Sequence, residues 1–197
     1  MTSMAAPQAS WRVVDIVVAS VLGVAFGVVF QVWNGAWELA KPVFIGFPPV
    51  QGLMYGIWLV PAVLVPLVVR RPGAALLAEL VAAAISALLG AQWGLQTLVY
   101  GLLQGAAAEL AFAFTLYRSW NLVTAMLAAA FAGAAAVLLD LVFYYPDWNA
   151  SYQITYAIVV VISTALLAGI GSWLLVRSLA NAGVLNAFPA GREQPEV

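Results

Sequence analysis

Long apolar runs dominate this sequence: 65% of its 197 residues are hydrophobic and only 8% are charged. A helix that crosses the hydrocarbon core of a bilayer, ~30 Å thick, needs about 20 residues. Apolar stretches of that order are separated here by charges or turn residues, and lipid offers their backbones no hydrogen-bond partner, which favours helices. The sequence therefore predicts an all-α bundle of six transmembrane helices, over residues 13–33, 51–69, 74–90, 95–117, 122–143 and 153–176.

One membrane domain takes in most of the chain. We expect it over residues 12–178, between an N-terminal tail (1–11) and a C-terminal tail (179–197), with poor order at 1–10 and 191–197. The first apolar run is too long for the hydrophobic region of a signal peptide and has no cleavage site after it, so we interpret it as a span. The richness in Ala and Val indicates a bacterial source. We therefore expect a multi-pass protein of a bacterial cell membrane.

The basic residues fall at one set of helix ends. Of the seven Lys and Arg residues, Lys41 alone lies at the opposite ends. The positive-inside rule then places both termini in the cytoplasm. The arginines at the inner ends are Arg12, Arg70, Arg71, Arg118, Arg177 and Arg192.

Three carboxylates, Glu79, Glu109 and Asp140, lie inside the apolar runs. An ionisable group in hydrocarbon costs at least ~2.5–3.5 kcal/mol, so each of them needs a compensating partner. A polar cavity that admits a cationic or hydrogen-bonding solute would supply one, which makes the three acids candidate ligand-binding residues. The alternative is a structural role: Glu79 would pair with Arg70 or Arg71 or with a helix N-terminus, and Asp140 would reach water near its helix end.

Aromatic and amide side chains gather at the predicted outer ends. Gln96, Tyr100 and Gln104 recur every four residues and form a polar stripe, whereas Glu109 is rotated about 140° from Gln104 at 100° per residue. Aromatic belts are common at membrane interfaces, but the outer ends carry more aromatics than the inner ends. This excess indicates an outward-facing cavity, covered by segment 34–50 as a lid. Its candidate wall residues are Tyr55, Trp93, Tyr100, Trp148 and Tyr152.

The sequence lacks the residues of several other functional classes. It contains no Cys and no His, which excludes thiol nucleophiles, imidazole bases and Cys/His metal sites. It also lacks a phosphate-binding glycine loop, an HExxH motif and a basic nucleic-acid patch. We therefore expect no enzyme, no cofactor, no metal site and no nucleic-acid partner, and any ATP hydrolysis would belong to another subunit.

Small residues form one face of the first predicted helix. Ala19, Gly23 and Gly27 recur every four residues, and such spacing lets another helix approach closely. The pattern alone favours packing within the bundle over contact with a partner protein.

Several short motifs, taken together, resemble the YkoE-type substrate-binding (S) component of energy-coupling factor (ECF) transporters. The resemblance extends from the first helix to Asn186. The motifs are Tyr55-Gly56-Ile57-Trp58, Arg70-Arg71-Pro72-Gly73-Ala74-Ala75-Leu76 with Glu79, Gln104-Gly105 with Ala108-Glu109, Asp140, and Gly183-Val184-Leu185-Asn186.

This resemblance implies a subunit that binds thiamine or its hydroxymethylpyrimidine precursor outside the cell. The ligand would pass inward after docking on a transmembrane coupling (T) subunit served by cytoplasmic ATPases. The resemblance further implies that Glu109 or Gln104 pairs with the aminopyrimidine, and that Ala19, Gly23 and Gly27 contact the T subunit. Alternatives are an S component for another vitamin or a metal, and a membrane assembly protein whose acids merely pair with arginines.

Overall fold

The computed structural model describes residues 10–192, and no strand occurs among them. The all-α prediction is thus confirmed for this part of the chain, while the expectations for 1–9 and 193–197 lie outside the described residues. Short 3-10 segments (η1, η2) and a π-helical segment (η3) interrupt the α-helices. The elements are α1 (Val13–Ala40), η1 (Lys41–Phe44), η2 (Pro48–Leu59), α2 (Val60–Val69), α3 (Ala74–Leu88), α4 (Gln96–Phe114), α5 (Leu122–Phe143), α6 (Ala150–Thr164), η3 (Ala165–Ile170), α7 (Gly171–Asn181) and α8 (Pro189–Arg192).

Five helical segments of the described chain are long and apolar enough to cross a membrane. The fifth predicted span, 122–143, has the bounds of α5. The third predicted span corresponds to α3, which is apolar but has only 15 residues. The five long segments are Val13–Phe44, Pro48–Val69, Gln96–Phe114, Leu122–Phe143 and Ala150–Asn181.

The first helix is longer than predicted. Instead of ending near Trp33, α1 continues to Ala40, and its buried stripe continues through Phe30, Asn34 and Trp37 at helical spacing. The indole Nε1 of Trp33 donates to the carbonyl of Met54, 3.0 Å away, and so ties α1 to η2. The predicted lid, 34–50, is therefore largely helical, and only η1 and the adjoining turn connect α1 with η2.

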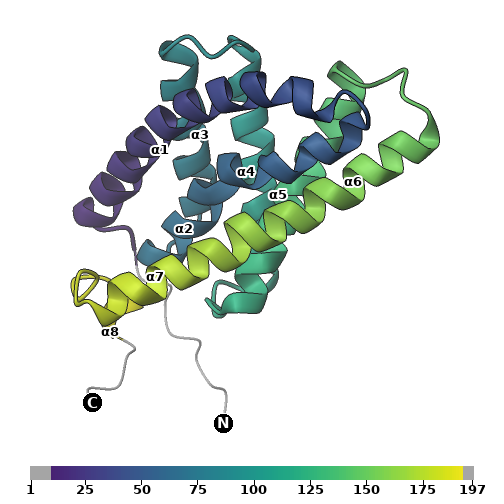
Figure 1. Ribbon diagram of the computed structural model, residues 1–197. Coiled ribbons are helices and arrows are strands. Elements are labelled where there is room, and N and C mark those ends of the chain that lie inside the picture. The colour runs from purple at the N-terminus through teal and green to yellow at the C-terminus, as the bar shows by residue number, and fades with distance from the viewer. Residues whose placement is uncertain (1–9, 193–197) are drawn as a thin grey trace.

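Helix α2 lies at the centre of the bundle. It contacts α1, α3, α4, α5, α7 and α8, and every residue from Pro61 to Val69 is buried. A helix surrounded by protein is apolar on all sides, which explains its run of Val, Leu, Ala and Pro. Figure 1 shows η2 and α2 beside the long rod formed by α6, η3 and α7.

The small-residue face of α1 packs against α3. Ala19 is completely buried. A Cβ added at Gly23 would lie 2.9 Å from Cβ of Val81, and one added at Gly27 would lie 2.5 Å from Cβ of Ile85. This face therefore packs on α3 within the bundle, as the spacing alone favoured.

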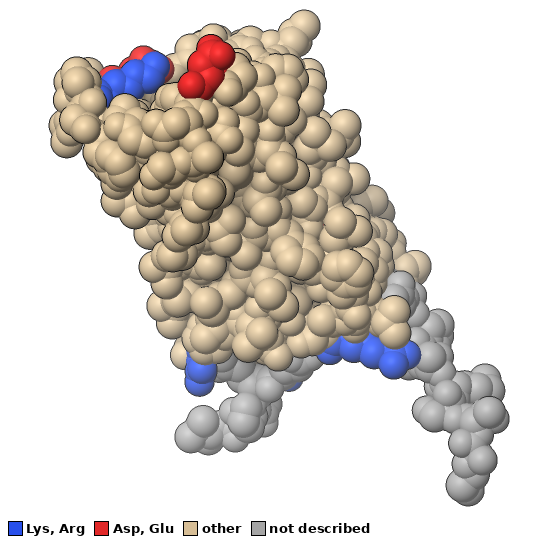
Figure 2. Space-filling model, turned by 90° about the vertical axis from the view of Figure 1, so that its right-hand side faces the viewer, with Lys and Arg blue, Asp and Glu red and all other residues tan. Residues whose placement is uncertain are grey.

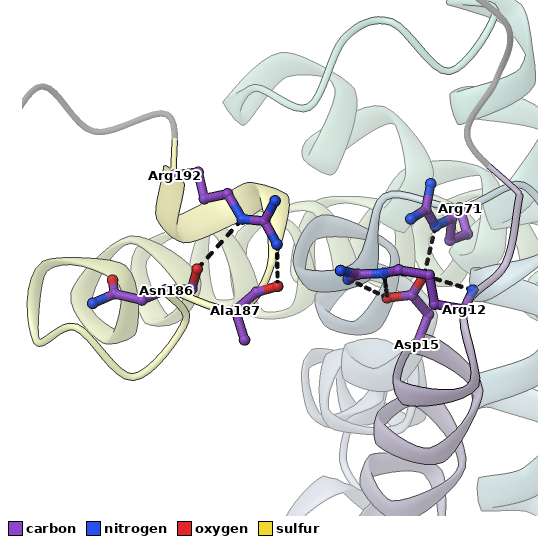
Figure 3. A network of polar contacts seen from close by, with 6 residues as sticks. All are labelled: Arg12, Asp15, Arg71, Asn186, Ala187 and Arg192. Carbon is purple, nitrogen blue, oxygen red and sulfur yellow. Dashed lines mark hydrogen bonds and ion pairs between the residues drawn. The ribbon is translucent and has the colours of Figure 1, made fainter.

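A buried ionic cluster ties the start of α1 to the turn between α2 and α3. The fully buried Asp15 accepts from Nη2 of Arg12 at 2.6 Å and from Nε of Arg71 at 2.8 Å (Figure 3). The indole of Trp11 donates to the carbonyl of Pro72, 3.0 Å away. Two cations beside one buried carboxylate compensate for its loss of water.

The charged groups divide the bundle into two ends. In Figure 2, Lys and Arg atoms gather at one end of the visible face, and Asp and Glu atoms lie at the other end beside a smaller basic group. We call the two ends the arginine end, where Arg12 and Arg71 meet Asp15, and the Lys41 end, where Lys41 pairs with Glu38.

The chain beyond residue 178 belongs to the folded domain up to residue 192. Helix α7 continues to Asn181, and the following segment folds back so that Leu185, Phe188 and Ala190 are buried. Arg192 donates to the carbonyl of Ala187 at 2.7 Å and so closes this turn (Figure 3). The predicted tail is thus ordered over 179–192, because its apolar side chains pack on the bundle.

Candidate functional site

A cavity of about 410 Å³ lies among the helices near the Lys41 end. This volume is within the range of small-molecule sites in proteins. Its wall draws on α1, η2, α3, α4, α5 and α6, so most of the bundle contributes to it. The lining residues are Phe30, Asn34, Trp37, Lys41, Pro48, Gln51, Tyr55, Trp58, Glu79, Ala83, Ser86, Trp93, Thr97, Tyr100, Gly101, Gln104, Asp140, Tyr144, Tyr145, Trp148 and Tyr156.

Glu79 of α3 joins the cavity wall to the start of α2. Its side chain is 1% exposed, and Oε2 accepts a hydrogen bond from the backbone N–H of Ala62 at 3.1 Å. Ala62 lies in the first turn of α2, directly after η2. Glu79 therefore binds a backbone amide at the junction of η2 and α2, which is close to the helix N-terminus role expected for it. The described residues offer no hydrogen bond to Oε1, which leaves that oxygen available to a ligand.

Asp140 of α5 is held by tyrosines in the wall. Its Oδ1 accepts from the hydroxyl of Tyr100 at 2.7 Å, and its Oδ2 accepts from the hydroxyl of Tyr156 at 2.6 Å. The residue is only 5% exposed. Phenol donors thus meet both oxygens of Asp140 inside the bundle, where the residue lines the cavity.

Behind these groups, Gln104 supports Tyr55. The side-chain amide Nε2 of Gln104 donates to the Tyr55 hydroxyl at 3.3 Å, and both residues are buried. The structure thus joins the polar stripe of α4 to η2 through this pair.

One aromatic wall lies where α5 and α6 meet. The rings of Tyr145 and Trp148 are stacked with centroids 4.0 Å apart, and Tyr156 meets Trp148 edge-on at 5.7 Å. Burial, and then the nearby Asp140 carboxylate, raise the pKa of Tyr145 to about 12. Tyr145 therefore stays a neutral phenol at physiological pH and adds no negative charge to the cavity.

A second aromatic wall is centred on Trp58. Its ring makes edge-on contacts with Trp37 at 5.1 Å, with Tyr55 at 5.4 Å and with Trp93 at 5.7 Å. Its indole Nε1 donates to Oδ1 of Asn34 at 2.9 Å. Three rings and one hydrogen bond thus fix the orientation of this indole, which suits it to pack against a planar ligand.

Most of the predicted site residues meet in this cavity, but two do not. Tyr152 lies beside the wall, where its ring contacts Phe47 at 5.2 Å and Trp148 at 5.9 Å. Glu109 is the other exception. The predicted residues that line the cavity are Tyr55, Glu79, Trp93, Tyr100, Gln104, Asp140 and Trp148.

Glu109 lies at the arginine end and caps α3. Its Oε1 accepts from the N–H of Gly73 at 2.6 Å, and its Oε2 accepts from the N–H of Ala75 at 2.9 Å. Burial, and then the adjacent Glu109 carboxylate, raise the pKa of the Tyr117 hydroxyl to about 12. The rotation of Glu109 away from Gln104 on α4, visible in the sequence, directs the two side chains to different places.

Sequence reasoning missed several wall residues. Trp37, Trp58, Tyr145 and Tyr156 were not singled out as candidates, although all four line the cavity. Spacing held a signal for two of them: Tyr156 lies one helical turn from Tyr152, and Trp58 lies three residues from Tyr55.

The cavity suits a small, flat solute that carries hydrogen-bond donors or positive charge. Two carboxylates and many aromatic rings face it, and the buried hydroxyl of Thr97 has no hydrogen-bond partner among residues 10–192. Among the described residues, no group of three or more acidic side chains is placed to bind a metal ion. A membrane helix bundle with a cavity of this kind defines a solute-binding protein of the membrane.

Comparisons with known proteins give the family. A family model described as "ABC-type cobalt transport system, permease component" matches residues 14–135. The chain is 35% identical over 187 residues to a protein of Bacillus subtilis (strain 168) that bears the name HMP/thiamine permease protein YkoE, with 93% of this chain and 92% of that one covered. A crystal structure of an S-component of an ECF transporter matches with a TM-score of 0.88 and 34% identity over 93% of each chain. This chain belongs to the YkoE family of ECF transporter S components, which are integral proteins of the bacterial cell membrane.

Proposed function

We propose that this protein captures thiamine or its hydroxymethylpyrimidine precursor at the cell surface for import. The name of the Bacillus subtilis relative supports this substrate class. The observation that carries the proposal is the pair of carboxylates in one aromatic-walled cavity. Glu79 has one oxygen, Oε1, to which the described residues donate no hydrogen bond, and Asp140 accepts hydrogen bonds from tyrosine hydroxyls.

Glu79 is the proposed partner of the aminopyrimidine. The exocyclic amine of that ring is a hydrogen-bond donor, and Oε1 of Glu79 is an acceptor to which the described residues donate no bond. Hydrogen bonds to a charged group are stronger than neutral ones, especially away from bulk water. Glu79 thus takes over the role that the family resemblance suggested for Glu109 or Gln104.

Asp140 and the aromatic rings are the proposed partners of the thiazolium ring of thiamine. This ring is a cation, and each aromatic face attracts a cation by about 0.5–2 kcal/mol. Trp148 and Tyr145 stack beside Asp140 and offer such faces. The precursor lacks the thiazolium and would use only the Glu79 part of the site.

We further infer that α3 crosses the membrane as a sixth, shorter span. Arginines gather at one end of the bundle, so the positive-inside rule places that end in the cytoplasm together with both termini. The cavity near Lys41 then opens outward, with η1 beside its mouth.

Release inward would follow docking on a T subunit and ATP hydrolysis by separate subunits. Docking through Ala19, Gly23 and Gly27 would require α1 to part from α3.

Ligand binding to the purified full-length protein tests the proposal. Titration calorimetry with thiamine and with hydroxymethylpyrimidine should give saturable binding of at least one of them. Glu79→Gln should weaken that binding about tenfold or more, because a charge-assisted hydrogen bond is worth about 1.5–3 kcal/mol. Glu109→Gln is the matched control and should retain the affinity. Absence of binding by both compounds, or an unchanged affinity in Glu79→Gln, would reject the proposal.

A further inference from the structure

The charge of the cavity wall is strongly one-sided. Its charged residues are the buried Glu79 and Asp140 and the exposed Lys41. Exposed acidic side chains also lie at the Lys41 end of the bundle (Figure 2). A ligand inside the cavity therefore meets two carboxylates and a single ammonium group.

The ammonium group of Lys41 is already neutralised. Its Nζ lies 2.6 Å and 2.7 Å from the two carboxylate oxygens of Glu38. Glu38 is held in turn by Gln92, whose Nε2 donates to Oε1 of Glu38 at 2.7 Å from the turn before α4. Glu38 thus pairs with the one cation that lines the cavity among the described residues, and Gln92 keeps it in position.

Backbone amides near the cavity do not replace this cation. Helix N-termini bind anions through unpaired N–H groups, but the first amides of α4 are already bonded. The N–H groups of Gln96, Thr97 and Leu98 donate to the carbonyls three residues before each, at 3.2, 3.2 and 3.0 Å. At the start of α2, Oε2 of Glu79 already takes the N–H of Ala62.

A phosphate monoester would bring negative charge into a cavity whose described wall already carries two carboxylates. It has about −1.5 to −2 charges at pH 7, and Lys41, the cation of that wall, is paired with Glu38. Both thiamine and its hydroxymethyl precursor carry an alcohol that can be esterified with phosphate, so this charge bears directly on the choice of substrate.

We propose that the site admits the free alcohol and rejects its phosphate monoester, with Glu38 as a specificity-determining residue. This inference rests on the proposed function, and it places a phosphate-monoester hydrolysis before uptake. In that reaction water adds to phosphorus, the bond from phosphorus to the ester oxygen breaks, and the alcohol and inorganic phosphate leave. The hydrolysis must take place outside the membrane, because the ester would not be captured.

Binding of thiamine and of thiamine monophosphate to the full-length protein tests the inference. In the natural protein at about pH 7, the monophosphate should bind at least about tenfold more weakly, equivalent to about 1.4 kcal/mol. Glu38→Gln leaves Lys41 charged without its partner. The ratio of the two dissociation constants should then shift about three- to fivefold in favour of the ester, the range expected for an exposed ion pair. Glu38→Gln combined with Lys41→Gln should return the ratio to its original value.

Asp147→Asn is the matched control. Asp147 is also exposed and follows α5 at the same end, but it does not line the cavity. Its substitution should leave the ratio unchanged. Equal affinity for ester and alcohol in the natural protein, or a shift in Asp147→Asn as large as in Glu38→Gln, would overturn the inference while thiamine still binds. If neither thiamine nor the precursor binds, the proposed function fails as well.

Discussion

The carboxylate of Glu109 lies 2.6 Å from the backbone nitrogen of Gly73, at the start of α3. It also accepts from the N–H of Ala75 at 2.9 Å, so one side chain of α4 satisfies two amides of the first turn of α3. Gly73 has a φ of 85°, a left-handed conformation that glycine adopts without strain. Glu109 thus fastens α4 to the tight turn between α2 and α3, and its negative charge faces the positive end of the α3 dipole.

Glu109→Gln should therefore lower stability without changing ligand affinity. Gln keeps the shape but loses the charge that both amides bind, which is expected to destabilise the fold by about 1–3 kcal/mol. The thermal unfolding midpoint in detergent should fall, whereas the dissociation constant of thiamine should change less than about twofold. Asp147→Asn, which removes an exposed carboxylate, should leave both quantities unchanged. A large loss of affinity at an unchanged midpoint would return Glu109 to the binding site.

Asp140→Asn should separate the two candidate ligands. The substitution retains the shape but removes the negative charge that Tyr100 and Tyr156 surround. Thiamine carries a cation and the precursor does not, so thiamine affinity should fall about tenfold and precursor affinity less than about threefold. Titration calorimetry with both compounds measures this difference.

Tyr156→Phe is the control for Asp140→Asn. It removes one hydrogen bond to Asp140 but keeps the carboxylate charge, so it should affect the two ligands to a similar degree. Equal losses for thiamine and the precursor in Asp140→Asn would show that the charge does not meet the thiazolium.

The sequence located the spans well where lipid decides their length and less well where protein contacts do. Helix α5 has its predicted bounds because turn residues and polar groups flank one apolar run. Helix α1 exceeded its prediction because Asn34 and Trp37 pack against other elements beyond the apolar run. Hydropathy cannot detect such contacts.

The sequence identified three membrane acids but could not rank them. Each carboxylate needs partners, and the partners of Glu79 and Glu109 are backbone amides of distant turns, at Ala62 and at Gly73. Backbone amides occur at almost every position, so composition gives no sign of which ones approach an acid. The 140° rotation between Gln104 and Glu109 was the one sequence signal that the two lie apart.

Asn34→Leu should loosen the indole of Trp58. The substitution removes the oxygen that accepts from Nε1 at 2.9 Å and leaves a buried donor unpaired, which costs about 1–3 kcal/mol. Thiamine affinity should fall several-fold, and the change of tryptophan fluorescence on ligand binding should decrease. Gln31→Ala is the control, because Gln31 contacts Asn34 on the other side of its amide, at 3.3 Å, and does not touch the indole. An unaltered fluorescence response in Asn34→Leu would show that this hydrogen bond does not fix the orientation of the Trp58 indole in the cavity wall.

Gly27→Ala should disrupt the contact between α1 and α3. A Cβ at this position would lie 2.5 Å from Cβ of Ile85 and 2.8 Å from the carbonyl oxygen of Ala82, so backbone as well as side chain must shift. Overpacking of this kind destabilises by about 1–3 kcal/mol, and the thermal midpoint should fall. Gly35→Ala in the same helix meets nothing within 4 Å and should raise the midpoint slightly, because Ala is the better helix former. If both variants behaved alike, the small-residue face would not be packed inside the bundle, and contact of Ala19, Gly23 and Gly27 with a coupling subunit would be the better explanation of their spacing.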